Sequence, residues 1–143
     1  MKARQMKMTA REIMNTRVTA ATRRAVARDL ALQLLSGQYS GLPVVDERDS
    51  QVIGVVTEFD LLKAAQEGKD FHTTTAEDIM SPVPVCVEED ATVEQIIKTM
   101  AEQNIIRLPV VRKGRLVGII ARADILSRMI EPEFIHYPND ASA

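Results

Sequence analysis

The sequence Leu42-Pro43-Val44-Val45 returns unchanged as Leu108-Pro109-Val110-Val111, 66 residues further along the chain (from 42 to 108). Ile13-Met14 returns at the same offset as Ile79-Met80. Matches that keep one order and one spacing indicate an internal duplication, which sets the architecture before any other feature is considered. The chain is therefore expected to contain two copies of one unit.

A third motif shows where the two copies differ in length. Val52-Ile53-Gly54-Val55-Val56 corresponds to Leu116-Val117-Gly118-Ile119-Ile120, with an offset of 64 (from 52 to 116). The difference of two residues falls in the polar stretches 46–51 and 112–115, and a hairpin turn tolerates such a change. Two copies are too few for a solenoid, so we expect a closed pair with pseudo-two-fold symmetry.

Each copy is expected to fold as helix, strand, helix, strand, strand, helix. Thr9 with Glu12, and Thr75 with Asp78, have the capping-box spacing of a helix start. Apolar residues at helical spacing predict amphipathic helices at 27–35 and 93–101. The other expected ranges are short strands at 18–19 and 83–87, and closing helices at 59–67 (before Gly68) and 123–130.

The apolar strands 52–56 and 116–120 are typical of strands covered on both faces. One copy of about 60 residues is marginal alone, so we expect both copies to share one core. The predicted fold class is α/β (α+β): two repeats, each a small mixed sheet with helices, packed sheet to sheet. We divide the chain into an N-terminal segment 1–7, a first repeat 8–68, a linker 69–75, a second repeat 76–130 and a tail 131–143.

Composition excludes several classes of protein. The 143 residues carry 18 Lys and Arg against 20 Asp and Glu, and this net charge of −2 argues against a basic nucleic-acid binder. Aromatic residues make up 3%, too few for a base-stacking platform. One cysteine and two histidines provide neither an intrachain disulfide nor a Cys/His zinc motif. Without a signal peptide or a membrane-length apolar run, we expect a cytoplasmic protein with no membrane span.

The motifs taken together resemble a tandem pair of cystathionine-β-synthase-type (CBS) domains, the regulatory unit called a Bateman module. They are Ile13-Met14, Leu42–Asp46 and Gly54–Asp60, with their counterparts in the second copy. The resemblance covers residues 8–130. It implies an α/β fold in each copy and two equivalent clefts that bind AMP, ADP, ATP or S-adenosylmethionine.

The resemblance also implies a regulatory role toward an enzyme or a transporter, here as a free-standing module. It implies a homodimer of modules that associate through their helices, with Met100 and Met129 as candidate surface residues. No Gly-x-Gly-x-x-Gly, phosphate-loop or Gly-x-Ser-x-Gly motif is present, so we expect no enzyme activity.

Thr57 and Asp60 are the first candidate site residues, at the junction of a strand and a helix. By residue type alone, Thr57 is a helix N-cap and Asp60 an acid that complements the helix dipole. A helix N-terminus also offers N–H groups that suit a phosphate. The resemblance implies that Thr57 and Asp60 contact ribose and phosphate, while Gly54 leaves room for close approach of a ligand. One threonine can serve as a cap and as a ligand contact in different states.

The second copy departs from this pattern. Ala121 replaces the threonine, although Asp124 keeps the carboxylate. Two arginines are new: Arg122 follows Ala121, and Arg107 stands where the first copy has Gly41. An arginine at position 107 resembles family members that hold a phosphate there. We therefore expect unequal clefts, the second preferring phosphate; the alternative is that Arg107 pairs with a neighbouring acid.

Adenine would need aliphatic walls because aromatic residues are scarce. The candidate wall residues are Leu42, Pro43, Leu108, Pro109, Val18, Val83 and Val85, and Gly41, at the position that matches Arg107, is a further candidate site residue. The alternative for the apolar members of this set is ordinary core packing.

The sequence thus favours a regulatory module that binds an adenosine-type small molecule and requires no cofactor or metal. The alternative is a ligand-free dimerisation or protein-interaction module. Nucleic-acid binding through the basic hairpin 112–115 is a weaker third hypothesis because the net charge is −2, and an enzyme is the least favoured hypothesis.

Overall fold

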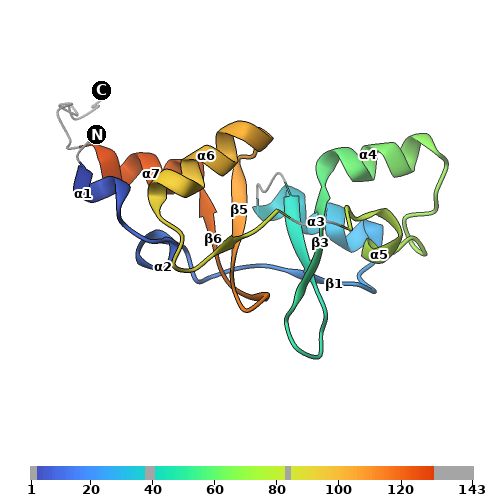
Figure 1. Ribbon diagram of the computed structural model, residues 1–143. Helices are drawn as coiled ribbons and strands as arrows, with labels where there is room; N and C mark the ends of the chain where they lie inside the picture. Colours follow the sequence, from blue (N-terminus) through green and yellow to red (C-terminus); the bar gives the residue numbers. More distant parts are fainter. Residues whose placement is uncertain (1–2, 38–40, 83–84, 131–143) are drawn as a thin grey trace, which may run out of the picture.

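The computed structural model describes residues 3–37, 41–82 and 85–130, and within them one six-element unit occurs twice (Figure 1). A short helix α1 (Ala3–Met6) precedes both units. The first unit consists of α2 (Ala10–Ile13), β1 (Ala21–Thr22), α3 (Ala27–Gly37), β2 (Gly41–Val45), β3 (Val52–Thr57) and α4 (Glu58–Gln66). The second consists of α5 (Ala76–Ile79), β4 (Val87–Glu88), α6 (Val93–Gln103), β5 (Arg107–Arg112), β6 (Arg115–Ala121) and α7 (Arg122–Met129). The predicted element order and α+β fold class are confirmed.

Each unit contains a small mixed sheet. The strand orders are β1-β2-β3 and β4-β5-β6. The first strand of each sheet runs parallel to the second, and the second runs antiparallel to the third. Leu42 lies opposite Val56, and Leu108 lies opposite Ile120, so the repeated motifs occupy the same register in both sheets.

The first strand of each sheet lies further along the chain than the sequence predicts. β1 begins at Ala21 rather than Val18, because pairing starts where the chain reaches Val44 of β2. Asn15, a few residues earlier, instead pairs with Ile119 of the other unit. In the second sheet, Val87 is the one described residue of the predicted 83–87 strand that belongs to β4. Val83 and Pro84 lie outside the described residues.

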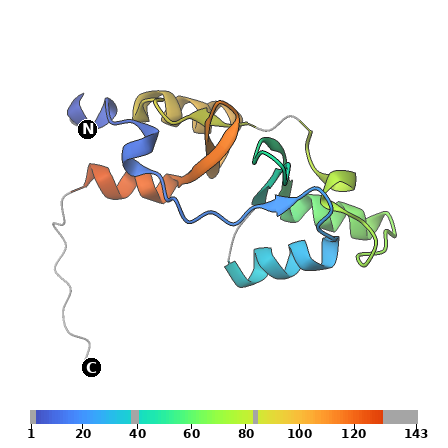
Figure 2. The same cartoon turned by 90° about the horizontal axis from the view of Figure 1, so that it is seen from below.

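The first helix of each unit packs against the other unit. Ala10 and Ile13 of α2 belong to an apolar core with Ile96, Leu108 and Ile120, all from the second unit. We call α3, α4, α5 and the first sheet the first lobe, and α1, α2, α6, α7 and the second sheet the second lobe. Figures 1 and 2 show the two lobes side by side, with the blue segment from α2 to β1 crossing between them.

The first lobe contains the reciprocal contact. Ala76 of α5 is fully buried in a core with Leu30, Val44 and Val56, all from the first unit. The expectation of one shared core is therefore wrong: the described residues form two apolar cores. Each core is completed by a helix from the other repeat, which explains how two small units stabilise each other.

Backbone hydrogen bonds fix this exchange in the same way on both sides. The Ala10 N–H donates to the Ala91 carbonyl, and the Ala76 N–H donates to the Ala25 carbonyl, both at 2.8 Å. The chain then runs along the third strand of the lobe on which its helix packs. There the Ser81 N–H donates to the Val55 carbonyl at 3.0 Å.

The glycine of each third strand makes room for the exchanged segment. A Cβ on Gly54 would lie 2.5 Å from the Met80 sulfur and 2.7 Å from the Ser81 carbonyl oxygen. Gly118 stands in the same relation to Met14 of the first repeat. The space above Gly54, which the sequence assigned to a ligand, is therefore occupied by the Ile-Met motif of the other repeat.

One dimer-surface prediction is wrong. Met100 is 4% exposed and belongs to the core of the second lobe, because it continues the apolar stripe of α6. Met129 is partly buried against the same core. No helix in the described ranges 3–37, 41–82 and 85–130 has the length and apolar character needed to cross a membrane.

Candidate functional site

A cavity of about 710 Å³ lies between the two lobes. Its volume falls within the range of pockets that hold small molecules. The first lobe contributes the start of β2, the end of β3 and the start of α4. The second lobe contributes the α6–β5 connection and parts of β5 and β6. The lining residues are Gly41, Leu42, Pro43, Val55, Thr57, Glu58, Phe59, Leu62, Ser81, Val85, Asn104, Ile105, Ile106, Arg107, Pro109 and Ile119.

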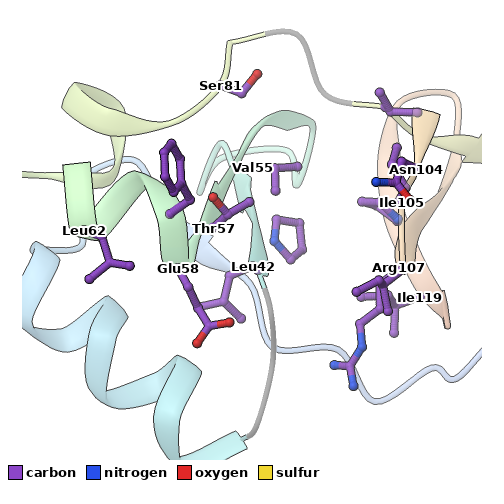
Figure 3. A pocket seen from close by; sticks show the side chains of 16 residues that line it. Leu42, Val55, Thr57, Glu58, Leu62, Ser81, Asn104, Ile105, Arg107 and Ile119 are labelled. Carbon is purple, nitrogen blue, oxygen red and sulfur yellow. The ribbon is translucent and has the colours of Figure 1, made fainter. Parts of the chain in front are cut away.

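Two matched apolar surfaces form opposite walls of the cavity. Pro43 lies opposite Val55 in the first sheet, and Pro109 lies opposite Ile119 in the second. All four line the cavity, and in Figure 3 the labelled Val55 and Ile119 come from the two separate sheets. An aliphatic slot of this kind can enclose a flat heterocycle without aromatic residues.

Thr57 ends β3 at the cavity and caps α4. Its hydroxyl accepts a hydrogen bond from the Asp60 N–H at 3.2 Å and donates to Asp60 Oδ2 at 3.0 Å. The Thr57 N–H also donates to Asp60 Oδ2, at 2.8 Å. The capping prediction is confirmed. Asp60 does not line the cavity but lies one hydrogen bond behind a residue that does.

Asp60 lines a smaller hollow instead. This hollow, of about 260 Å³, lies between α4 and α5 and also contains Lys63 and Asp78. Asp78 accepts from the Thr75 N–H at 2.9 Å, so both carboxylates serve as partners in capping boxes.

Arg107 is the first residue of β5 and lies on the opposite wall of the cavity. It is partly buried and lines the cavity. Glu58 lines the same cavity from the first lobe, so the cavity has one basic and one acidic side chain on its two sides (Figure 3). The sequence placed Thr57 and Arg107 in separate clefts, whereas the structure places both around one cavity.

Arg122 and Asp124 have local partners. Arg122 Nε donates to the Ile105 carbonyl at 3.0 Å, and its Nη2 lies 3.4 Å from Asn104 Oδ1. Arg122 therefore holds the α6–β5 connection that lines the cavity, rather than lining it itself. Asp124 accepts from the Ala121 N–H at 2.7 Å, the same cap position that Asp60 occupies in the first lobe.

Seven of the predicted site residues line the cavity: Gly41, Leu42, Pro43, Thr57, Val85, Arg107 and Pro109. Val18, Asp60, Leu108, Arg122 and Asp124 do not, and Val83 lies outside the described residues. Leu108 is fully buried in the second core, which matches the alternative of ordinary packing.

Several lining residues were not predicted. Val55, Phe59 and Ile119 lie within the repeated glycine motifs and Ser81 directly follows Ile79-Met80, so the motifs themselves carry a signal for them. No motif marks Leu62 or the residues 104–106, which reach the cavity only through the folded arrangement. In the part of the chain that the structure describes, no three His, Cys, Asp or Glu side chains gather into a metal-binding group.

Comparison with known proteins is consistent with this arrangement. The family model of the CBS domain matches residues 10–67 and 76–131. The uncharacterized protein MK0525 of Methanopyrus kandleri is 36% identical over 111 residues, or 76% of this chain and 55% of that protein. The chain thus spans about half the length of this relative.

Two solved structures with the same fold hold adenosine-containing ligands. The crystal structure of CBSX2 in complex with AMP is 27% identical, with a TM-score of 0.75, and covers 85% of this chain and 95% of that chain. The CBS domain pair of protein MJ0100 was solved with 5′-methylthioadenosine and S-adenosyl-L-methionine. It is 28% identical, with a TM-score of 0.72, and covers 85% of this chain and 94% of that chain.

Proposed function

Because the chain belongs to the CBS-domain family as a tandem pair, we propose that it is a regulatory module that binds an adenosine-containing ligand between its lobes. The cavity is the observation that carries this proposal, because both repeats line it and a ligand there contacts both lobes at once. Two structural relatives hold AMP, or 5′-methylthioadenosine and S-adenosylmethionine, which supports the ligand class.

We expect the adenine to lie between the two aliphatic walls, with Pro43 and Val55 on one side and Pro109 and Ile119 on the other. Burial of this apolar surface would supply most of the affinity, at about 25 cal/mol per Å². Thr57 and Asp60 together present a hydroxyl and a carboxylate at the end of β3. We propose that they accept hydrogen bonds from the ribose hydroxyls, and that Asp60 turns partly away from its capping contact with Thr57 to do so.

Arg107 favours a phosphate-bearing ligand. AMP, ADP and ATP carry a net negative charge on phosphate, whereas S-adenosylmethionine combines a sulfonium cation with an ammonium and a carboxylate group and has no net negative charge. A guanidinium group pairs with phosphate through two hydrogen bonds and stays charged at working pH. We therefore propose a nucleotide rather than S-adenosylmethionine. The role of Asp124 stays a prediction, because its carboxylate does not reach the cavity in this conformation.

A protein-interaction module is the second candidate function, and the exposed helix faces favour it. Leu32 and Leu35 on α3 are 51% and 71% exposed, Leu62 on α4 is 67% exposed, and Leu126 on α7 is 58% exposed. Large apolar side chains exposed at several helices suit a partner surface. We propose that these helices mediate a homodimer, the commonest closed oligomer. We also propose that a partner enzyme or transporter binds this dimer and is regulated by it. Light scattering at micromolar concentration should give the dimer mass; a monomer mass would contradict this assembly.

Calorimetry separates the two functions. AMP, ADP, ATP and S-adenosylmethionine are titrated separately into the protein, and we expect saturable binding of at least one nucleotide. Arg107→Ala should lower the affinity for AMP by about ten- to a hundred-fold, the size of one charge-assisted interaction. It should lower the affinity for adenosine much less. The AMP effect should shrink as salt rises.

Two variants serve as controls. Arg107→Lys keeps the charge but loses the planar fork, so we expect an intermediate AMP affinity. Arg24→Ala removes an exposed arginine that does not line the cavity and should leave binding unchanged. Equal losses for AMP and adenosine in Arg107→Ala would contradict the phosphate role. No heat with any ligand from folded protein would favour the interaction module instead.

A further inference from the structure

The two exchanged helices are held by ion clusters as well as by apolar contacts. In the first lobe, Arg23 donates to Asp46 at 2.7 Å and to Glu77 of α5 at 3.0 Å. Asp46 is 5% exposed and Arg23 is partly buried. The incoming helix thus places its acid on an arginine that the first lobe already pairs with a buried carboxylate.

The second lobe contains a cluster of the same shape. Glu89 is 7% exposed and accepts from Arg112 of β5 at 3.0 Å. Arg11 of α2 donates to the same carboxylate at 2.9 Å. Here the incoming helix places its arginine on an acid that the second lobe already pairs with another arginine.

At three matched positions the two clusters carry opposite charges; Arg48, which also pairs with Asp46 at 2.9 Å, belongs to the first cluster alone. All three positions are related by the 66-residue offset of the repeats. The matched pairs are Arg11 and Glu77, Arg23 and Glu89, and Asp46 and Arg112.

The other contacts of the exchanged helices do not distinguish the two lobes. The Arg11 N–H donates to the Glu89 carbonyl at 2.9 Å, and the Glu77 N–H donates to the Arg23 carbonyl at 3.0 Å. Both helices insert an alanine first and end in the same Ile-Met pair. Backbone geometry and apolar side chains would therefore allow either helix to pack on either lobe.

Packing on the wrong lobe would bring like charges together. Arg11 would meet Arg23, and Glu77 would meet the buried Glu89. A like charge beside a buried ionised group is costly, because neither water nor a counter-ion compensates it. Specific pairings in proteins commonly use such repulsion in addition to attraction.

We propose that the reversed ion clusters select the partner of each exchanged helix, so that α2 packs only on the second lobe and α5 only on the first. The lobes are two interaction surfaces of the same shape, one that accepts a basic helix and one that accepts an acidic helix. This role goes beyond ligand binding and does not depend on it.

The test removes the charge difference but keeps complementary pairs. In R11E/E89R/R112E the second cluster becomes a copy of the first, with an arginine between two acids. Both lobes then accept an acidic helix, and both helices are acidic. In R23E/D46R/R48E/E77R, where Arg48 is also changed because it pairs with Asp46, both lobes accept a basic helix, so the second variant tests the same idea from the other side.

Cysteine pairs report where α2 packs. Thr9 pairs with Thr92 in this fold, and Val26 pairs with Thr75. By the 66-residue offset, α2 on the wrong lobe would place Thr9 beside Val26. The pair T9C/T92C therefore reports correct packing, and T9C/V26C reports wrong packing. Both are made with Cys86, the sole native cysteine, changed to serine, and disulfide formation is followed by non-reducing gels and peptide mass spectrometry.

With native charges we expect the T9C/T92C disulfide to form and the T9C/V26C disulfide to be at least ten-fold less abundant. In both charge variants the T9C/V26C disulfide should be at least ten-fold more abundant, whether it joins residues of one chain or of two chains. The exposed control R24E should leave the ratio unchanged. If neither charge variant forms more T9C/V26C disulfide than the parent, the ion clusters do not select the partner, and the proposal is overturned.

Discussion

Met80 covers Gly54, although the two residues belong to different repeats. The methionine sulfur and the Ser81 carbonyl occupy the space that any side chain at position 54 would need. The glycine motif and the Ile-Met motif of this chain are thus two halves of one contact, repeated between Gly118 and Met14. This contact joins the exchanged segment to the strand that forms a wall of the cavity.

Gly54→Ala should lower the free energy of unfolding by about 1–3 kcal/mol, the usual cost of overpacking. The methionine side chain can move, but the Ser81 carbonyl belongs to the backbone, so the strain is not fully relieved. Urea denaturation followed by circular dichroism measures the change. Adding Met80→Ala should recover part of the loss. An unchanged midpoint in Gly54→Ala would show that this close contact does not exist in solution.

Ala121→Thr should stabilise the chain. Ala121 has the extended backbone of an N-cap, with φ −103° and ψ 159°, close to the −109° and 167° of Thr57. Asp124 already accepts from the Ala121 N–H, so a threonine hydroxyl would complete the capping box. We expect a gain of about 0.5–1 kcal/mol, and a loss of similar size in Thr57→Ala. A destabilised Ala121→Thr would mean that the hydroxyl clashes with its surroundings.

The second-lobe ion cluster should make stability depend on acid pH. Hydrogen bonds from Arg112, and then from Arg11, lower the pKa of Glu89 from 4.5 to about 2. A carboxylate with a lowered pKa in the folded state stabilises fully above its unfolded pKa. Its contribution is lost as the pH falls from about 4.5 through about 2.

Glu89→Gln should therefore reduce the pH dependence of the urea midpoint between pH 5 and pH 2, and should lower stability at pH 7 because two arginines lose their partner. Glu94→Gln, on an exposed position of α6, serves as the control. If the urea midpoint falls with pH equally steeply in Glu89→Gln and in the parent, a group other than Glu89 causes the pH dependence.

Much of the fold could be predicted because its determinants are local. The offset of 66 residues, the capping pairs at Thr9, Thr57 and Thr75, and the amphipathic helices are all encoded within short segments. The element order followed from these. Only the first strand of each sheet was misplaced, because two residues of strand carry little pattern and their position depends on the neighbouring strand.

The exchange between repeats could not be predicted from this periodicity. A duplicated motif shows that Met14 and Met80 are equivalent, but it does not show which glycine each one covers. For the same reason Arg107 and Thr57 were assigned to separate clefts, whereas the facing lobes bring them to one cavity. The family resemblance implies association through the helices and so predicts a surface position for Met100, whereas Met100 lies in the core of the second lobe, to which α2 contributes Ala10 and Ile13.

A nuclear magnetic resonance titration with AMP tests the central claim most directly, since it locates the ligand without changing the protein. The backbone amides are labelled with ¹⁵N and followed as AMP is added to saturation. We predict that the largest shift changes fall on Gly41, Leu42, Thr57, Ile106 and Arg107, from both lobes, while the exposed end of α3 is unaffected. Saturating shifts confined to one lobe or to the outer helix faces, or no shifts at millimolar AMP, would contradict a nucleotide site between the lobes.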